Sequence, residues 1–183
     1  NKVVVNTAGT VTLAGAATIN SDLTISSGTF SVSTYTLTVA GNLTVNGTLA
    51  GSGAITLSGA EKTIDGTGSI TPTGTITISA NKTIPASAVL TFAGTLSISS
   101  CVTVTNNGTI TVNGNINGGA ATSTWINAAG STLNVGGALL TTGTLTASAN
   151  PNTVSYISTT GIQTVKATTY HHLTINKSGQ TAN

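Results

Sequence analysis

The sequence has very little charge and few aromatic side chains. Charged residues make up 4% of its 183 positions, against about 25% in ordinary globular domains. Five scattered lysines and no arginine cannot neutralise a phosphate backbone, which excludes nucleic-acid binding. Disorder requires low hydrophobicity with high net charge, whereas this chain is 38% hydrophobic with a net charge of +2. We therefore expect a folded, nearly neutral protein.

Other absences narrow the fold class. The single cysteine, Cys101, excludes a disulfide framework, and no apolar run approaches the roughly 20 residues of a membrane-spanning helix. Good helix formers such as Leu, Glu, Lys and Arg are scarce beside Thr, Val, Ile, Gly and Asn, which disfavours a helical bundle. The sequence begins at Asn1 without a Met or an apolar leader, so we expect a processed segment or a fragment.

Threonine and glycine are abundant, and they recur at a fixed spacing. The chain contains 40 Thr and 22 Gly. Gly-Thr pairs recur every 19 residues and begin at Gly9, Gly28, Gly47 and Gly66. Self-similarity at a constant period of this length is typical of repeat architectures.

Three columns of apolar residues follow nearly the same period. The first column is Ile25, Val45, Ile64, Ile84 and Val104. The second column is Val11, Phe30, Leu49, Ile70, Leu90 and Ile110. The third column is Leu37, Ile55, Ile76, Leu96 and Ile116. Because the columns interleave within one period, each repeat contains three short arms.

The arms are predicted to be β-strands, because apolar and hydroxyl residues alternate in segments such as Thr36-Leu-Thr-Val39. Gly and Asn at the ends of the arms suit corners, where φ is often positive. The pattern predicts an all-β, right-handed parallel β-helix (β-solenoid) with three short strands per coil of about 19–20 residues. The chain length then gives about nine coils and a rod about 43 Å long. An antiparallel sandwich is the less favoured alternative, because hairpin turns do not explain three interleaved columns.

One solenoid domain is expected over residues 1–183, with regular coils over about 9–117 and less regular coils over 118–183. Lys62 and Lys82 occupy equivalent places in adjacent coils, and we expect both at solvent-exposed corners. A bare end coil exposes unpaired backbone groups and an apolar cross-section. Since neither end shows an amphipathic helix that could cover it, we expect each end to join more of the same chain or another subunit.

The residues able to perform chemistry are few and dispersed. Glu61 and Asp65 could form the carboxylate pair of a glycoside hydrolase, but solvated corner positions are the favoured interpretation. His171 and His172 are expected on opposite faces of a strand, and a zinc site that joins them to Cys101 is disfavoured. No base stands near the thiol in the sequence. We therefore assign no catalytic, cofactor-binding or metal-binding residue, and no cofactor.

Two features could serve binding. Trp125 is a possible carbohydrate contact, because its ring could stack on a sugar, although such a Trp equally often fills a core. Thr-x-Thr phrases such as Thr10-Val-Thr12 and Thr109-Ile-Thr111 could order water on a flat solenoid face and so bind ice. These phrases fall on different arms, however, so ordinary solvent-facing strand residues are the favoured interpretation.

Two phrases carry a resemblance. They are Gly41-Asn-Leu-Thr-Val-Asn-Gly-Thr48, and Gly161-Ile-Gln-Thr-Val165 followed by Tyr170-His-His-Leu-Thr-Ile-Asn-Lys-Ser-Gly179. Both are similar to repeats in large secreted surface proteins of gliding and related bacteria, which resemble filamentous adhesins with β-helical stalks. The usual form of the second phrase has Asn where this chain has His172. The resemblance implies export to the cell surface, adhesion or fibre formation, and no catalysis.

Together these features predict a non-catalytic structural protein, extracellular or at the cell surface. It is expected to form a fibre or an adhesin stalk, with head-to-tail stacking of solenoids as the route to assembly. The expected partners are further coils or copies at the solenoid ends and a host-surface or glycan target, with no nucleic acid and no membrane span. The alternative is a binding module for ice or carbohydrate on one solenoid face.

Overall fold

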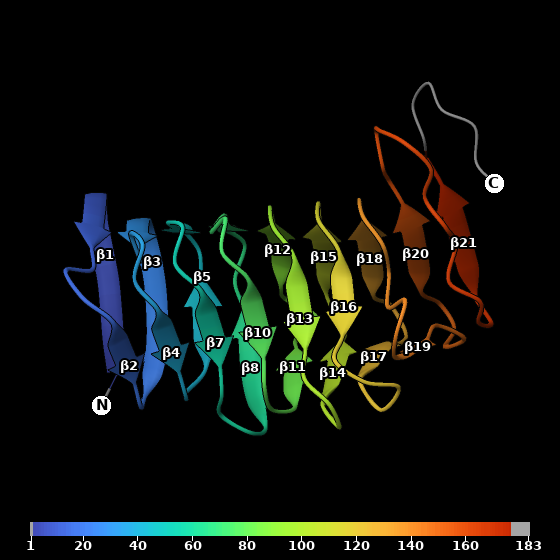
Figure 1. Ribbon diagram of the computed structural model, residues 1–183, viewed down its shortest axis with the longest axis horizontal. Helices are drawn as coiled ribbons and strands as arrows, with labels where there is room; N and C mark the ends of the chain where they lie inside the picture. Colours follow the sequence, from blue (N-terminus) through green and yellow to red (C-terminus); the bar gives the residue numbers. More distant parts are fainter. Residues whose placement is uncertain (1, 177–183) are drawn as a thin grey trace.

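The computed structural model describes residues 2–176, which form 21 β-strands and no helix. The paired strands run parallel, and the chain winds as a solenoid of about nine coils (Figure 1). The all-β parallel solenoid predicted from the sequence is confirmed. Within the described part of the chain, no helix is long and apolar enough to cross a bilayer.

The strands lie on three faces. Face A holds the first halves of β1 (Lys2–Thr12) and β3 (Asp22–Ser31), then β5 (Leu43–Val45), β8 (Lys62–Asp65), β11 (Lys82–Ile84), β14 (Thr103–Asn106), β17 (Thr124–Asn127) and β19 (Thr144–Thr146). Face B holds the second halves of β1 and β3, then β6 (Thr48–Ala50), β9 (Ser69–Ile70), β12 (Val89–Phe92), β15 (Thr109–Val112), β18 (Thr132–Val135), β20 (Thr153–Tyr156) and β21 (His172–Ile175). Face C holds β2 (Ala17–Ile19), β4 (Leu37–Val39), β7 (Ile55–Leu57), β10 (Ile76–Ile78), β13 (Leu96–Ile98) and β16 (Ile116–Gly118).

Faces A and B form one hydrogen-bonded sheet because β3 runs from one face to the other without a break. The strand turns the corner at Gly28, whose φ is +70°. A Cβ there would overlap the carbonyl oxygen of Thr7 in the preceding coil. The corner therefore requires glycine both for its backbone angle and for the close approach of the neighbouring coil.

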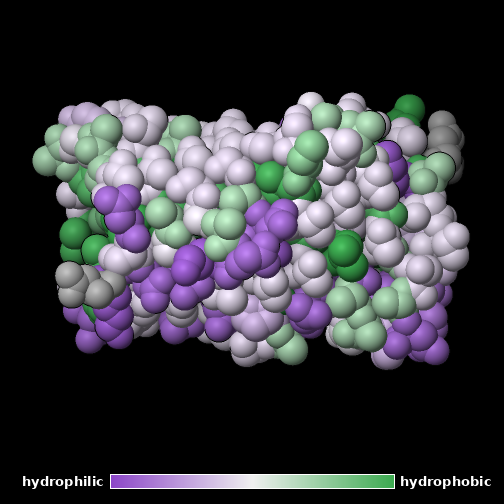
Figure 2. Space-filling view, turned by 90° about the horizontal axis from the view of Figure 1, so that it is seen from below, coloured by the Kyte–Doolittle hydropathy of each residue, from purple (hydrophilic) through white to green (hydrophobic). Residues whose placement is uncertain are grey.

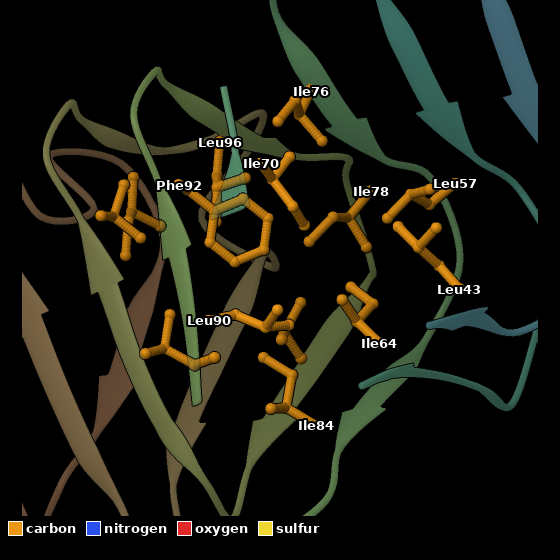
Figure 3. Close-up of a cluster of buried hydrophobic side chains, with 14 of the residues drawn as sticks. Leu43, Leu57, Ile64, Ile70, Ile76, Ile78, Ile84, Leu90, Phe92 and Leu96 are labelled. Atoms are coloured by element: carbon orange, nitrogen blue, oxygen red, sulfur yellow. The ribbon is translucent and has the colours of Figure 1, made fainter. Parts of the chain in front are cut away.

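The core is a stack of aliphatic side chains inside the coils. In three-residue strands such as β4, β5 and β7 the first and last residues are buried and the central one is half-exposed, as strand geometry requires. In the middle of the rod the labelled side chains converge on a common interior, and Ile64 lies next to Ile84 (Figure 3). Each buried aliphatic side chain stabilises the fold by roughly 1.5–3 kcal/mol, so the stack supplies stability without charge.

The third predicted column is confirmed throughout, because its members are register partners from coil to coil: Leu37, Ile55, Ile76, Leu96 and Ile116. All of them are buried. Face C thus has the most regular spacing in the first six coils.

The second column contains one wrong pairing. Ile70 is level with Phe92 rather than with Leu90. Between these coils lies an added turn, in which the N–H of Ala88 donates to the carbonyl of Pro85 at 3.0 Å. This turn lengthens the segment between faces A and B by two residues, so the register changes on face B. The corner before Leu96 is two residues shorter, so face C keeps its register.

The first column contains two wrong pairings of the same kind. Ile64 is level with Leu43 instead of Val45. Val104 is level with Lys82 instead of Ile84. Each observed partner lies two residues before the predicted one. Side chains on a strand alternate between its faces, so a shift of two residues keeps every apolar side chain inside. Inward packing therefore does not determine which of these pairings forms.

Regular winding ends on face C before it ends on the other faces. The face C strands stop at β16, and Leu139 continues the series by a single bridge to Ile116. Residues 157–169 contain no strand, and the chain rejoins face A through a bridge between Tyr170 and Ala147. Faces A and B continue to β19 and β21. The described coils thus become less regular after about residue 118, where the spacing of the sequence also loosens.

An asparagine ladder lies buried inside the corner between faces A and B. Asn106 Nδ2 donates to Asn127 Oδ1 at 2.9 Å and to the carbonyl of Thr132 at 3.1 Å. Asn127 Nδ2 donates to the carbonyl of Thr153 at 3.0 Å, and Asn152 Nδ2 donates to the carbonyl of Asn127 at 2.9 Å. The buried amides thus bond to one another and to backbone carbonyls, and they connect successive coils at this corner.

Candidate functional site

The two carboxylates considered for glycoside hydrolysis bind neighbouring coils. Asp65 Oδ1 accepts hydrogen bonds from the N–H of Gly66 at 2.7 Å and from Ser87 Oγ at 3.2 Å. Glu61 Oε1 accepts from Asn81 Nδ2 at 3.1 Å. Glu61 directly precedes β8, and Asp65 is the last residue of that strand, which is about 10 Å long. Each carboxylate holds a corner, and the geometry does not direct the pair at a common point.

Asp22 has the same role two coils earlier on the same face. Its Oδ1 accepts a hydrogen bond from the N–H of Asn42 at 2.8 Å. This bond lowers the pKa of Asp22, and the side chain of Asn42 and the charge on Lys62 add to the effect. The Asn42 side chain bonds to the next coil in the same way, because its Oδ1 accepts a hydrogen bond from the N–H of Thr63 at 2.9 Å. These side chains connect successive coils.

Lys82 contradicts the expectation of a solvent-exposed corner. It is level with Lys62, as expected, but only 3% of it is exposed. Its side chain points inward on β11, and Nζ donates to the carbonyl oxygens of Gly59 and Ala80. The alternation of the strand places residue 82 on the inward side, beside Val104. Burial lowers the pKa of Lys82, the charge on Glu61 opposes this change, and the charge on Lys62 adds to it.

Replacement of Lys82 by methionine is expected to stabilise the solenoid by about 1–2 kcal/mol, because a buried charge is removed from an apolar column. Water can satisfy the two corner carbonyls, since Gly59 and Ala80 are half-buried. Urea unfolding of Lys82→Met and of the control Lys62→Met measures the effect, and the control should change by less than about 0.5 kcal/mol.

The pH dependence of the stability difference between Lys82→Met and the wild type tests whether the buried charge causes it. The unfolded chain binds a proton on Lys82 up to about its ordinary pKa of 10.5, whereas the folded chain releases it at lower pH. Stability of the wild type therefore rises with pH through that interval, and the advantage of Lys82→Met shrinks. If Lys82→Met is less stable than the wild type, or if its gain in stability does not change with pH up to 10.5, then the buried ammonium does not destabilise the fold.

The prediction that the two histidines lie on opposite faces of a strand is wrong. His171 stands just before β21, where strict alternation does not apply, and His172 is the first residue of that strand. Their rings meet edge to face, with centroids 4.1 Å apart. Between residues 2 and 176, His, Cys, Asp and Glu side chains do not gather in threes around any point that could hold a metal ion.

Cys101 is exposed at a corner with a φ of +60°. The hydroxyl of Thr122 accepts a hydrogen bond from its N–H at 3.0 Å and lies 3.5 Å from Sγ. A hydroxyl is a poor base near neutral pH, so this contact does not activate the thiol.

Trp125, the possible carbohydrate contact, is completely buried. It points inward on β17, level with Val104 on one side and Leu145 on the other. Its indole therefore offers no face to a sugar, and the core interpretation holds. Nε1 has no hydrogen-bond partner in the structure. The strand alternation that buries Asn127 also directs the indole inward.

A polar cluster in the last coils was not found from the sequence. Gln163 is buried, and its Nε2 donates to the carbonyls of Val135 at 2.9 Å and Gly137 at 2.7 Å. The hydroxyls of Tyr156 and Tyr170 lie 3.0 Å apart. Burial, together with this contact, raises the pKa of Tyr170. Only the loss of the sequence period after residue 117 hinted at this change.

The cluster attaches residues 157–169 to the coil before them and leaves a cavity of about 720 Å³ beside face C. Leu139, Thr141, Ser158, Thr160 and Ile162 are among its lining residues. The amide of Gln163 is fully engaged with the backbone.

The longest ordered array of polar side chains is a ladder on face B, with one residue per coil. Its members are half-buried or exposed, except Ser155 on β20, which is buried. Each member is the register partner of the next: Thr10, Thr29, Thr48, Ser69, Thr91, Thr111, Asn134, Ser155 and Thr174. The ladder crosses all nine described strands of the face. We call it the face B ladder.

A shorter ladder runs along face C. Its members are Thr18, Thr38, Thr56, Thr77, Ser97 and Asn117. The Thr-x-Thr phrases do fall on different arms, as the sequence indicated. Winding nevertheless brings single threonines from successive repeats into line.

Charge is confined to one of the three faces in the described strands. All charged residues in these strands lie on face A: Lys2, Asp22, Lys62, Asp65 and Lys82. Figure 2 views the molecule from below and shows hydrophilic residues gathered in a band, with much of the remaining surface of intermediate hydropathy. The ladders of faces B and C are therefore uncharged.

No family model, curated protein or solved structure matches this chain.

Proposed function

We propose that this chain is a non-catalytic structural solenoid, a stiff segment of an extracellular fibre or adhesin stalk that stacks end to end. The observation that carries the proposal is the state of the two end strands. Within residues 2–176, β1 pairs only with β3, and β21 pairs only with β20. Both strands thus present one unpaired edge, which is a template for another strand.

The end strands also carry apolar side chains that a further coil would bury. On β1, Val11 is 44% exposed although its register partner Phe30 is buried. On β21, Leu173 is 41% exposed although its partner Val154 is buried. Within residues 2–176 no coil covers these core positions, and each covering side chain would add roughly 1.5–3 kcal/mol on full burial.

The two ends match in pattern. Val11-Thr12-Leu13 and Leu173-Thr174-Ile175 both alternate apolar, hydroxyl and apolar residues. Val11 on β1 is level with the buried Phe30. On β21, Leu173 and Ile175 are level with buried residues of β20. A second copy can therefore add its β1 edge to the β21 edge of the first in parallel register. The resemblance to secreted bacterial surface repeats supports the extracellular setting.

Sedimentation velocity over a wide range of protein concentration tests the proposal. The wild type should show sedimentation coefficients that increase with concentration, and negative-stain images should show rods of variable length. Val11→Lys and Leu173→Lys should each weaken association at least tenfold, because a lysine would be buried without a partner.

Val89→Lys is the matched control, since Val89 is 53% exposed on β12 in the middle of the rod. It should associate as the wild type does. A wild type that stays monomeric at every concentration would refute end-to-end stacking, as would a control that dissociates as far as the end variants.

A further inference from the structure

The face B ladder has the regularity of a lattice. Neighbouring members are register partners on hydrogen-bonded strands, so their Cα atoms repeat about every 4.8 Å along the rod. Six of its nine members are threonine, whose branched Cβ restricts χ1. Asn134 Nδ2 donates to Thr111 Oγ1 at 3.1 Å, so the side chains also bond along the ladder.

A second column widens the lattice in two places. Near the N-terminal end, Thr12 and Ser31 are register partners beside Thr10 and Thr29. In the later coils a separate column stands two residues before the ladder. It consists of Thr109, Thr132 and Thr153. Side chains two residues apart on a strand are about 6.6 Å apart, so these parts of face B carry two-dimensional arrays of hydroxyl and methyl groups.

The chemistry of face B suits a ligand made of water. Charged side chains organise their own hydration shells, and the described strands of this face contain none. Hydroxyl groups donate and accept hydrogen bonds in the way water does, while the methyl groups of Thr leave the water between them without a competing partner. A lattice of fixed hydroxyls can therefore hold water molecules at repeating positions.

We propose that face B binds an ordered water lattice, namely the surface of ice. A crystalline polysaccharide would also present a periodic surface, but sugar binding favours exposed aromatic rings. The aromatic side chains on the face B strands are Phe30, Phe92 and Tyr156, and all three are buried. The one exposed ring on the described strands of this face is the imidazole of His172, at the start of the end strand β21. The middle of face B therefore lacks a stacking platform.

Thermal hysteresis and inhibition of ice recrystallisation by the full chain test this proposal. The wild type should lower the freezing point below the melting point and keep ice grains small. Thr91→Lys and Thr111→Lys place a charge in the middle of the ladder, and each should need at least tenfold more protein for the same inhibition.

Thr77→Lys is the matched control. Thr77 has the same half-buried central position, on β10 of face C, and its variant should inhibit recrystallisation as the wild type does. Circular dichroism and urea midpoints confirm that all variants are folded, and Thr91→Val tests the hydroxyl with its shape retained. A wild type without either ice activity would overturn the proposal. So would equal losses in face B and face C variants, or binding to insoluble cellulose or chitin without an effect on ice.

Discussion

Gly53→Ala is expected to destabilise the solenoid by about 4 kcal/mol, which corresponds to a fall of roughly 10 °C in Tm for a chain of this size. Gly53 precedes β7 and lies directly over Tyr35 in the preceding coil. A Cβ built on it would overlap the Tyr35 carbonyl oxygen and lie 2.6 Å from the carbonyl carbon. Backbone atoms cannot move aside as a flexible side chain does, so the coils would have to separate.

The control for this prediction is Gly15→Ala. A Cβ on Gly15 would meet no atom within 4 Å, and its φ lies outside the left-handed region. Its substitution should change stability by less than about 1 kcal/mol. Differential scanning calorimetry of both variants measures the difference. Equal midpoints would mean that the coil spacing at this corner yields to an added methyl group, contrary to the close approach described above.

Asn127→Leu is expected to cost about 3 kcal/mol, although leucine has a similar size and is more apolar. The substitution removes the acceptor of Asn106 Nδ2 and the donor to the carbonyl of Thr153. Asn127 is fully buried, so water cannot easily replace the lost bonds, and unpaired buried polar groups cost about 1–3 kcal/mol each.

Asn117→Leu provides the comparison, because Asn117 is half-buried and points outward on β16. It should remain within about 0.5 kcal/mol of the wild type. Urea unfolding monitored by circular dichroism gives both values. If Asn127→Leu unfolds at the wild-type midpoint, the ladder contributes packing alone and its hydrogen bonds add no stability.

The sequence allowed prediction of the three-sided architecture because the apolar period repeats on every face. Face C gave correct pairings throughout, since coils of nearly constant length bring Leu37, Ile55 and Ile76 into line. Faces A and B each contain wrong pairings, because corner turns such as that at Pro85 change the number of residues between one face and the next. A shift of two residues keeps the buried side buried, so hydrophobicity alone cannot distinguish the alternatives.

The functional residues were less predictable than the fold. Lys82 was expected at the surface on the basis of residue type, and Trp125 was considered equally as a sugar contact and as a core residue. The alternation of their strands places both inside. Gln163 could not be anticipated, because its contacts depend on a segment that leaves the repeat. The members of the face B ladder could be identified only from the observed strand pairing, since a shift of two residues replaces one outward neighbour by another.

The parallel direction of the strands has a consequence for any assembly built on the end contact. The β1 edge and the β21 edge are different surfaces, so the contact is heterologous and does not close on itself by two-fold symmetry. A filament built this way is polar, with a distinct chemical identity at each tip. Subunits would then join the two tips at unequal rates, and every ladder along the filament would keep a single orientation from one tip to the other.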